Sequence, residues 1–245
     1  KLERNKKMKK DLLIGVSGLR NSGKDTVCNI IDYIMRNGIM KVDYNKWIVN
    51  GINNTIYKKQ TIGFADGIKD ILSRLFGIKR ECFDSRAYKD TLYFYLKERQ
   101  FVTIETAQRE HTTIIHNQMI NTNFGLNQYM NTNACIKLRT LMQWFGTEIG
   151  RNQLYDEVWI EDTIRRANKI RNRNKYCLIS DVRFGNESEA IHNAEGIIIK
   201  VERPNLTKDN HPSEELNFEY DFIINNDGSL MTLFYRVLEF IKQEL

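Results

Sequence analysis

A glycine-rich loop, GLRNSGKDT at residues 18–26, comes directly after the apolar run LLIGVS at residues 12–17. A run of this length is too short for a helix, and its apolar character predicts a central parallel strand. The loop fits the spacing G-x-x-x-x-G-K, in which backbone N–H groups, a helix N-terminus and Lys24 surround a polyphosphate. The alternative is a glycine-rich turn that binds nothing. The order of strand, glycines, lysine and helix favours nucleotide binding.

The residue after the loop lysine departs from the common pattern. A Ser or Thr whose hydroxyl supports Mg2+ usually stands there, whereas this chain has Asp25 followed by Thr26. The loop is similar to the G-K-x-T variant of nucleotide kinases of the adenylate kinase type, so we expect Thr26 to support the metal. The expected nucleotide-binding residues of the loop are Gly18, Asn21, Ser22, Gly23, Lys24, Asp25 and Thr26.

Positive charge is concentrated at the start of the chain. The 245 residues carry a formal net charge of +6, and residues 1–10 hold six Lys or Arg against one Glu, a balance of +5 that leaves +1 for the remainder. We interpret residues 1–10 as a basic flexible tail, so the charge does not require a nucleic-acid partner. A nucleic-acid-binding module built from the tail and the basic run at residues 165–175 is an alternative, and a solvated helix face explains that run more simply.

Composition is typical of a soluble globular protein. Hydrophobic residues make up 41% and charged residues 28%, and no apolar stretch approaches the ~20 residues that span a bilayer. The cysteines form no C-x-x-C pair, which argues against a zinc knuckle and indicates reduced thiols in a cytoplasmic protein. These cysteines are Cys28, Cys82, Cys135 and Cys177. The histidines, which form no metal set, are His111, His116, His192 and His211.

Apolar strands alternate with amphipathic helices along most of residues 11–245. This alternation predicts one α/β domain with a parallel sheet covered on both faces. The expected strands are residues 12–17, 60–64, 176–180, 196–201 and 220–224. The expected helices are residues 25–37, 65–76, 137–149, 156–170 and 229–245. In the helix at 65–76, helical spacing places Ile68, Ile71, Leu72 and Leu75 on the core face.

Residues 80–135 interrupt this alternation. The segment is rich in Asn, Gln, Thr and Tyr, and it contains two similar heptapeptides, NQMINTN and NQYMNTN. We interpret it as an insertion beside the sheet, a hairpin with helices that contributes to an acceptor-binding or lid region. The alternative is a polar excursion without a role.

Two helical segments carry candidate acceptor-binding residues. The helix after strand 60–64 contains Asp66 and Lys69, and ligands of open α/β sheets lie beyond the carboxyl ends of the strands, where Lys69 can reach a phosphate. An ordinary helix start with Asp66 near its cap is an equal alternative. In LRTLMQWFGTEIGR, residues 138–151, Arg139 and Gln143 share a helix face that suits a phosphate and a base edge. A solvated face is the default alternative.

A third cluster is SDVRFGNESE, residues 180–189. Its apolar strand ends in Asp181 in the manner of a Walker B element, whose carboxylate holds Mg2+ directly or through water. Arg183 follows two residues later, where it can turn toward a transferring phosphoryl group, and Glu187 is placed to orient this arginine. A helix cap is the alternative for a strand-ending aspartate, but its combination with a phosphate loop favours a functional role.

Together these segments resemble the deoxynucleoside monophosphate kinases of T-even-type bacteriophages and their viral and bacterial relatives. The matching elements are GLRNSGKDT, FADGIKD, LRTLMQWFGTEIGR with Trp159 downstream, ISDVRFGNESE, IIIKVERP, HPSE at residues 211–214, and DFIINNDGSL. The combination of LMQxxGTE and DVRFxNE is the most specific part. Only the basic tail and much of residues 80–135 stay outside the resemblance.

The resemblance implies a three-layer P-loop kinase fold with an inserted acceptor or lid region. It also implies transfer of the γ-phosphoryl group of ATP to a deoxynucleoside monophosphate, with Mg2+ as cofactor. By the same resemblance Lys24, Asp181, Arg183 and Glu187 are catalytic, and residues 203–214 form a mobile flap. The acceptor-side residues that it implies are Arg139, Gln143, Trp144, Thr147 and Arg151.

Other acceptors and other functional classes stay open. A P-loop kinase for another small acceptor, such as dephospho-coenzyme A, would share the donor half. A nucleotide-regulated binding protein would use the loop as a switch, although the arginine-rich segments favour an enzyme. We expect ATP and a deoxynucleoside monophosphate as partners, in the cytoplasm (the host cytoplasm if the protein is viral) and away from membranes. Neither the preferred base nor the oligomeric state follows from the sequence, and a homodimer is one alternative.

Overall fold

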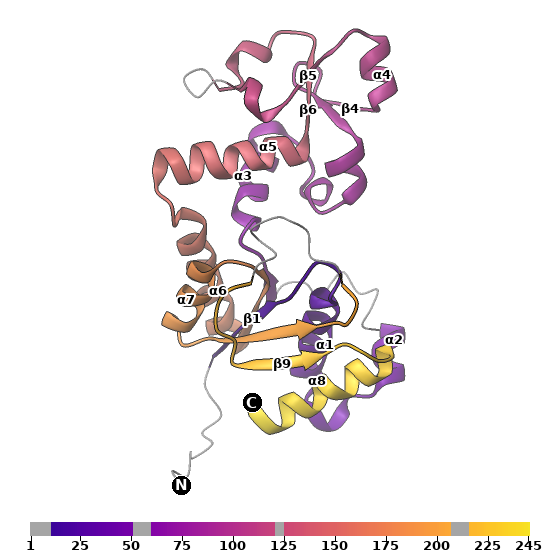
Figure 1. Cartoon of the computed structure of the whole chain (residues 1–245), viewed down its shortest axis with the longest axis vertical. Coiled ribbons are helices and arrows are strands. Elements are labelled where there is room, and N and C mark those ends of the chain that lie inside the picture. Colours follow the sequence, from indigo (N-terminus) through magenta and orange to yellow (C-terminus); the bar gives the residue numbers. More distant parts are fainter. Residues whose placement is uncertain (1–10, 51–59, 121–124, 207–215) are drawn as a thin grey trace. The chain divides into compact units, whose positions relative to one another are not determined.

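The computed structural model describes residues 11–50, 60–120, 125–206 and 216–245 (Figure 1). The chain divides into two compact units. Unit 1 consists of Lys1–Phe64 and Ile160–Leu245, and unit 2 is Ala65–Trp159. Unit 1 is therefore built from both ends of the chain, and unit 2 is inserted into its sequence.

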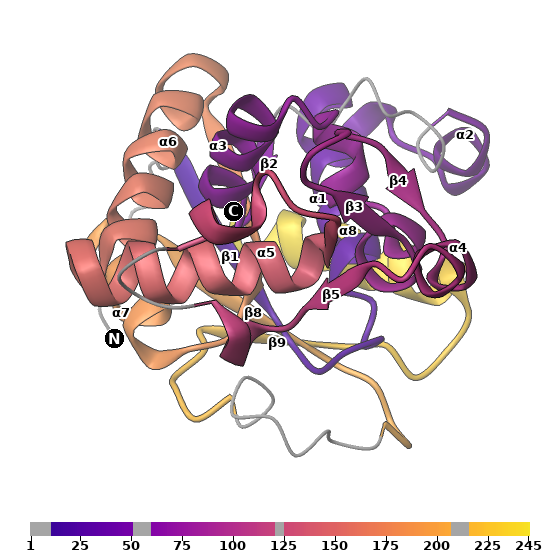
Figure 2. The ribbon, with the colours of Figure 1, turned by 90° about the horizontal axis from the view of Figure 1, so that it is seen from above.

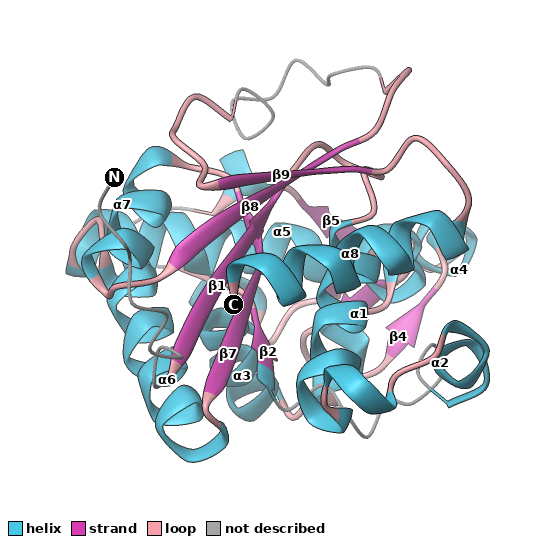
Figure 3. Ribbon diagram, turned by 90° about the horizontal axis from the view of Figure 1, so that it is seen from below, coloured by secondary structure: helices cyan, strands magenta, loops and turns pink. Residues whose placement is uncertain are grey.

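Unit 1 contains a five-stranded sheet in which every neighbouring pair is parallel (Figure 3). The strands are β1 (Leu12–Ser17), β2 (Thr61–Ile62), β7 (Tyr176–Val182), β8 (Ile197–Glu202) and β9 (Phe222–Asn225). Their order in the sheet is β2-β7-β1-β8-β9. The central strand is thus β1, and its register places Ile14 opposite Leu178 on one side and Ile197 on the other.

Helices cover both faces of this sheet. They are α1 (Lys24–Asn37), α2 (Tyr44–Asn50), α6 (Val158–Asn174), α7 (Gly185–Asn193) and α8 (Leu230–Glu244). Alternate residues of β1 enter different cores, as the period of a strand requires. Ile14 and Val16 belong to a buried cluster with residues of α1 and α8, whereas Leu13 belongs to another with residues of α6 and α7. The predicted three-layer α/β fold with a parallel sheet is confirmed.

Unit 2 contains a second, mixed sheet in the order β4-β3-β6-β5, part of which is labelled in Figure 2. Its strands are β3 (Tyr93–Tyr95), β4 (Phe101–Val102), β5 (Thr113–Ile115) and β6 (Ala134–Lys137). Its helices are α3 (Asp66–Phe76), α4 (Ile104–Arg109), α5 (Leu138–Trp144) and the π-helical segment η7 (Phe145–Leu154). Single turns are η1 (Ile39–Lys41) in unit 1 and, in unit 2, η3 (Arg80–Phe83), η4 (Ala87–Thr91), η5 (Asn117–Met119) and η6 (Asn127–Tyr129).

The glycines of the GTEIGR segment make room for Trp159. The indole N–H of Trp159 donates a hydrogen bond to the Gly146 carbonyl oxygen at 2.8 Å, and a Cβ at Gly150 would lie 2.4 Å from Trp159 Nε1. We predicted one regular helix over 137–149. The structure instead has an α-helix to Trp144 followed by a π-helical segment to Leu154. A π-helical turn is wider than an α-helical turn, and the close indole contacts fall within this segment.

Three further expectations need correction. The strand predicted at 60–64 covers only Thr61–Ile62. On α3, Ile71 and Leu75 are 39% and 60% exposed, so the buried stripe of this helix is narrower than its spacing predicted. The 80–135 segment contains the expected hairpin, β3 with β4, and a helix, α4, but it also supplies β5 and β6, which we did not predict.

Some predicted features lie outside the described residues. These are the basic tail at 1–10 and residues 207–214 of the flap, with His211 and the HPSE element. Within the ranges that the structure describes, no helix is long and apolar enough to cross a membrane. Nor do three or more His, Cys, Asp or Glu side chains gather there in a group that could hold a metal ion. The four cysteines are free thiols.

Candidate functional site

The glycine loop, residues 18–26, joins β1 to α1 in a conformation that requires two of its glycines. Gly18 and Gly23 have φ angles of 144° and 101°, which residues with a side chain rarely adopt. A Cβ at Gly18 would lie 2.5 Å from the Val201 carbonyl oxygen, and a Cβ at Gly23 would lie 2.5 Å from Asn226 Nδ2. Asn21 also has a positive φ, 65°, which asparagine tolerates. The loop therefore packs closely against residues at the ends of β8 and β9.

Lys24, the first residue of α1, turns its ammonium group back over the loop. Nζ donates hydrogen bonds to the carbonyl oxygens of Gly18 at 2.7 Å and Leu19 at 2.9 Å. It also lies 3.3 Å from Asp181 Oδ1. Because Lys24 is only 8% exposed, its charge is held among these oxygens. One cation thus connects the glycine loop to the end of β7.

Asp181 occupies a bulge in β7. Val16 pairs with Ser180 and Ser17 pairs with Val182, so Asp181 has no opposite residue on β1. Its φ angle is 68°. We predicted a strand over 176–180 that ends in Asp181, but it continues to Val182. Bulges beside active sites redirect a side chain, and here the carboxylate reaches Lys24 at the start of α1.

The Asp181 carboxylate is stabilised in its charged form. Burial by itself would raise the pKa of Asp181, but a hydrogen bond from Arg183 and the charges of Arg183 and Lys24 outweigh burial, and the pKa lies below its ordinary value. Arg183 Nε lies 2.9 Å from Asp181 Oδ1, the same oxygen that Lys24 approaches. The structure therefore brings together three of the four residues predicted to be catalytic.

Glu187, the fourth of these residues, holds the main chain that carries Arg183. Its Oε2 accepts hydrogen bonds from the backbone N–H groups of Arg183 at 2.8 Å and Phe184 at 3.2 Å. Glu187 is 4% exposed and lies in the first turn of α7, where a carboxylate satisfies free N–H groups and is favoured by the helix dipole. Glu187 thus contacts the backbone of Arg183, whose side chain lies beside Asp181.

The other polar residues of the loop differ in exposure. Ser22 is 1% exposed, and its hydroxyl has no hydrogen-bond partner among the described residues. A buried hydroxyl without a partner is uncommon, and in a loop rich in backbone N–H groups it fits a site that binds a hydrogen-bonding ligand. Thr26 is half-buried in the first turn of α1, and Asp25 is exposed.

Two residues outside the predicted catalytic, nucleotide-binding and acceptor sets also contact the loop. Asn226, directly after β9, donates a hydrogen bond from Nδ2 to the Ser22 carbonyl oxygen at 2.8 Å. Arg203, directly after β8, donates to the Asn21 carbonyl oxygen at 3.4 Å. Each follows the last residue of a parallel strand, the place where such sheets gather their functional residues. That position is the sequence signal that could have identified them.

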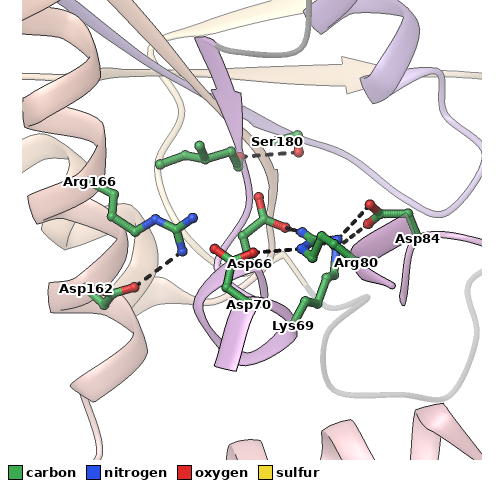
Figure 4. Close-up of polar contacts among 9 residues, drawn as sticks. Asp66, Lys69, Asp70, Arg80, Asp84, Asp162, Arg166 and Ser180 are labelled. Atoms are coloured by element: carbon green, nitrogen blue, oxygen red, sulfur yellow. Dashed lines mark hydrogen bonds and ion pairs between the residues drawn. The ribbon is translucent and has the colours of Figure 1, made fainter. Parts of the chain in front are cut away.

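In unit 2, carboxylates surround Lys69 and Arg80 (Figure 4). Lys69 Nζ lies 3.1 Å from Asp66 Oδ1 and 2.8 Å from Asp84 Oδ1. Arg80 lies 2.8 Å from Asp66, 2.8 Å from Asp70 and 2.7 Å from Asp84. Burial would raise the pKa of Asp84, but Lys69 and Arg80 lower it below its ordinary value. The predicted pair Asp66 and Lys69 is therefore part of a larger ionic network.

Arg139 and Gln143 lie one turn apart on α5, and both are exposed. Arg139 Nε lies 2.6 Å from Asp90 Oδ1, and Gln143 Oε1 accepts a hydrogen bond from Asn117 Nδ2 at 3.4 Å. The predicted phosphate-binding arginine and base-reading amide thus have polar partners from residues 80–135, most of which lie outside the resemblance.

Lys89 adds positive charge near the predicted acceptor residues. It lies in η4, and its pKa is lowered, first by burial and then by the positive charges of Lys69 and Arg139. An anion bound beside such a cluster would relieve the repulsion between the cations. The polar segment 80–135 carries no motif that distinguishes Lys89 from its other lysines.

The remaining predicted acceptor residues follow along the same helical stretch. Trp144 ends α5, and its indole N–H has no hydrogen-bond partner in the part of the chain that the structure describes. Thr147 is exposed and Arg151 is half-buried, both in η7. The predicted acceptor set is therefore carried by unit 2, and the glycine loop with Asp181, Arg183 and Glu187 by unit 1.

The match of this sequence to a known protein family covers nearly the whole chain. Residues 12–237 match the family model described as deoxynucleotide monophosphate kinase. The chain belongs to the deoxynucleotide monophosphate kinase family. The range matched to this family begins at the first residue of β1 and ends within α8. It includes residues 80–135, most of which the resemblance of the motifs alone had left aside.

One viral protein is similar to this chain over part of its length. It is a protein of Acanthamoeba polyphaga mimivirus, provisionally named deoxynucleotide monophosphate kinase, and it is 28% identical over 118 residues. The similar region covers 41% of this chain and 58% of the relative. The match thus spans little more than half the length of that curated relative.

Proposed function

We propose that this protein transfers the γ-phosphoryl group of ATP to a deoxynucleoside 5′-monophosphate, with a deoxynucleoside diphosphate and ADP as products. The observation that carries the proposal is the convergence of Lys24, Asp181 and Arg183 beside the glycine loop. Family membership supports the class of acceptor. Cations around a loop of backbone N–H groups are what a phosphoryl-transfer site needs, since little covalent chemistry is left for the protein to do.

The glycine loop is the proposed site for the phosphates of ATP. The N-terminus of α1, the buried Ser22 hydroxyl and the Lys24 ammonium group all belong to it. Backbone N–H groups and a helix dipole favour an anion there, and a lysine adds a full charge. A polyphosphate bound in the loop would also give the Ser22 hydroxyl the partner that the described residues do not provide.

Thr26 and Asp181 are the residues that we propose to hold Mg2+. Hydroxyl, carboxylate and water oxygens are the ligands that Mg2+ prefers, and one or two carboxylates are usual. Lys24 and Arg183 both approach Asp181 through Oδ1, and we assign the Asp181 carboxylate to the metal or to its water. When bound, Mg2+ would neutralise phosphate charge that the loop and Lys24 leave uncompensated.

The mechanism follows from the distribution of charge. Two phosphate-bearing substrates repel each other, and positive groups fixed in advance lower the cost of bringing them into line. Lys24 is fixed by two loop carbonyls and Asp181. Arg183 is fixed by Asp181 at its side chain and by Glu187 at its backbone. We assign Arg183 to the charge that develops during transfer and Lys24 to the donor phosphates.

Unit 2 carries the residues that we propose to bind the acceptor nucleotide. Arg139 and Lys69 suit the monophosphate, with Lys89 as a third cation near them. Gln143 suits a base edge because its amide both donates and accepts hydrogen bonds. The complete proposed set is Asp66, Lys69, Arg139, Gln143, Trp144, Thr147 and Arg151.

We further propose that the partners are these small nucleotides, without nucleic acid, and that the protein acts in the cytoplasm. The net charge of +6 comes mainly from residues 1–10, which hold none of the proposed site residues. A homodimer is a proposal that light scattering of the purified protein tests directly.

One panel assay tests the proposed reaction. The full chain is incubated with ATP, Mg2+ and, separately, each natural dNMP, 5-hydroxymethyl-dUMP and several ribonucleoside monophosphates. We expect ADP and the corresponding diphosphate to form in equal amounts for at least one dNMP, and chelation of the metal by EDTA to stop the reaction. Lys24→Ala is the control for contaminating kinases.

Two results would contradict the proposal. The first is phosphorylation of dephospho-coenzyme A with no dNMP accepted, which would keep the donor site and replace the acceptor. The second is ATP binding without any acceptor-dependent ADP formation by the folded protein, which would indicate a nucleotide-regulated binding protein.

A further inference from the structure

A side chain near the end of the sequence holds a carbonyl group of the glycine loop. Asn226 Nδ2 donates a hydrogen bond to the Ser22 carbonyl oxygen at 2.8 Å. The same amide group fills the space beside Gly23, since a Cβ at Gly23 would lie 2.5 Å from Asn226 Nδ2 and 3.6 Å from its Cγ. Asn226 is therefore in contact with two consecutive residues of the loop.

This contact sets the direction of a backbone N–H group. The Ser22 C=O and the Gly23 N–H belong to one planar trans peptide group, so they point in opposite directions. A hydrogen bond that fixes the carbonyl on one side aims the Gly23 N–H toward the other. Loops of this kind bind anions through consecutive N–H groups. The φ of 101° at Gly23 is one of many angles open to glycine, and in this conformation the Asn226 amide lies against Gly23.

The structure also fixes Asn226 itself. The backbone N–H of Asn226 donates to the Glu202 carbonyl oxygen at 2.6 Å. This bond continues the pairing of β8 with β9 beyond the last residue of β9. Arg236 of α8 donates to the Asn225 carbonyl oxygen at 2.6 Å and pairs with the Asp227 carboxylate. One guanidinium group thus holds the residues on both sides of Asn226, so the amide that braces the loop has a rigid support.

We propose that Asn226 is a positioning residue that sets the glycine loop for the polyphosphate of the donor nucleotide. The inference rests on the proposed function, because it takes the loop to be a phosphate site. An asparagine suits this task, since its amide donates to the Ser22 carbonyl without adding charge. An aspartate of the same size would set an oxygen against that carbonyl and a negative charge near the phosphates.

The test compares Asn226→Asp and Asn226→Ala with the full-length wild-type chain. Isothermal titration gives the Kd for ADP, and steady-state kinetics give the KM for ATP and for the most active dNMP. Loss of one hydrogen bond that orients a binding group should raise the ADP Kd about tenfold in Asn226→Ala, and the repulsive Asn226→Asp should raise it further. The KM for ATP should rise in parallel, while the KM for the dNMP stays within about twofold of wild type.

Asn225→Ala is the matched control, because Asn225 is the exposed neighbour of Asn226, and it should leave the ADP Kd unchanged.

If wild type does not bind ADP, the proposed function fails and this inference fails with it. If wild type binds ADP and both Asn226 variants bind it equally well, only the inference is wrong. Thermal unfolding without nucleotide completes the test. If both variants are unfolded at the assay temperature, Asn226 serves the fold and not the loop, which would also overturn the inference.

Discussion

Lys24 Nζ lies 3.3 Å from Asp181 Oδ1, an ion pair between the first residue of α1 and a bulged residue of β7. The same carboxylate oxygen receives Arg183 at 2.9 Å. The donor loop and the segment that carries the proposed catalytic arginine therefore share one anion, and substitutions at these three residues should have separable effects.

Lys24→Ala should nearly abolish turnover and leave the fold intact. Lys24 supplies a fixed positive charge over the loop carbonyls, and removal of one preorganised charge donor typically costs about a hundred- to thousandfold in rate. Measurement of kcat with saturating ATP and dNMP, alongside circular dichroism, checks this. Lys46→Ala, at an exposed position on α2, should behave like wild type. A folded Lys24→Ala protein with normal turnover would contradict the assignment of the donor site.

Arg183→Ala should lower kcat roughly a hundredfold and weaken ATP binding much less. It should also change the pH profile. Arg183 helps to hold the pKa of Asp181 below its ordinary value, so its removal raises that pKa, and the carboxylate becomes protonated at a higher pH during acidification. The acid limb of kcat/KM should therefore shift to higher pH. Arg173→Ala, exposed on α6, is the control. A rise in the KM for ATP alone would make Arg183 a ground-state binder.

Asp181→Asn and Asp181→Ala should separate charge from backbone conformation. Both remove the carboxylate that we assign to the metal, so both should lose most activity. Asp181 has a φ of 68°, which asparagine tolerates and alanine does not. The left-handed conformation costs other residues about 1–2 kcal/mol, so the alanine variant should be less stable than the asparagine variant by about that amount in urea unfolding. Equal unfolding free energies for the two variants would exclude backbone strain at the bulge.

Tyr176→Phe should destabilise the protein more at neutral than at acid pH. The Tyr176 hydroxyl donates to Asp32 Oδ1 at 2.8 Å, and a bond to a charged group is worth about 1.5–3 kcal/mol. Burial raises the pKa of Asp32, and hydrogen bonds from Arg36 and Tyr176 oppose that rise. A raised folded-state pKa means that stability falls as the pH rises through it.

Without the Tyr176 hydroxyl, the pKa of Asp32 moves still higher and the variant loses more stability over the same range. Urea unfolding at about pH 4 and about pH 7 measures the difference from wild type, which should grow with pH. Tyr33→Phe removes the hydroxyl of a half-buried residue on α1, the helix that carries Asp32, and should show no such trend. A difference that shrinks as the pH rises would contradict the role assigned to the hydroxyl.

Arg80→Ala should destabilise the protein by about 1 kcal/mol in low salt. The substitution leaves Asp66 and Asp84 with Lys69 and removes the ion pair of Arg80 with Asp70. These carboxylates are 20–51% exposed, and solvent weakens each pair. The loss should diminish in about 1 M salt, where screening acts within a few ångströms. Arg74→Ala, exposed on α3, should have little effect at either salt concentration. An effect of Arg80→Ala that does not change with salt would indicate packing of the side chain as its cause.

The sequence predicted unit 1 well because its elements are long, apolar and periodic. The strand at 12–17 and the helix at 25–37 match β1 and α1 within one residue, since Val27, Ile30, Ile31 and Ile34 repeat at helical spacing and are all fully buried. Motifs at the ends of two strands implied that Lys24 and Asp181 converge. The two residues are close because β1, which precedes the glycine loop, and β7, which contains Asp181, are neighbours in the sheet.

Unit 2 shows where such reasoning fails. Its strands β3 and β5 have three residues each, too few for a period of two to be recognised. On α3, the spacing of Ile71 could not reveal how wide the buried stripe is, because that depends on what packs against it. Nor does any local pattern mark the bulge at Asp181, because it depends on a partner strand that is distant in the sequence.

The position of β1 in the sheet bears on how the protein is made. β1 ends at Ser17, yet the strands on either side of it begin at Tyr176 and Ile197. On the ribosome, β1 must therefore wait for neighbours that emerge after the whole of unit 2. Pairing across such long stretches is slow, and apolar segments that await their partners aggregate readily. The nascent chain should accordingly depend on chaperones until its last third has been synthesised, whereas unit 2, whose chain is continuous, can fold while translation is still under way.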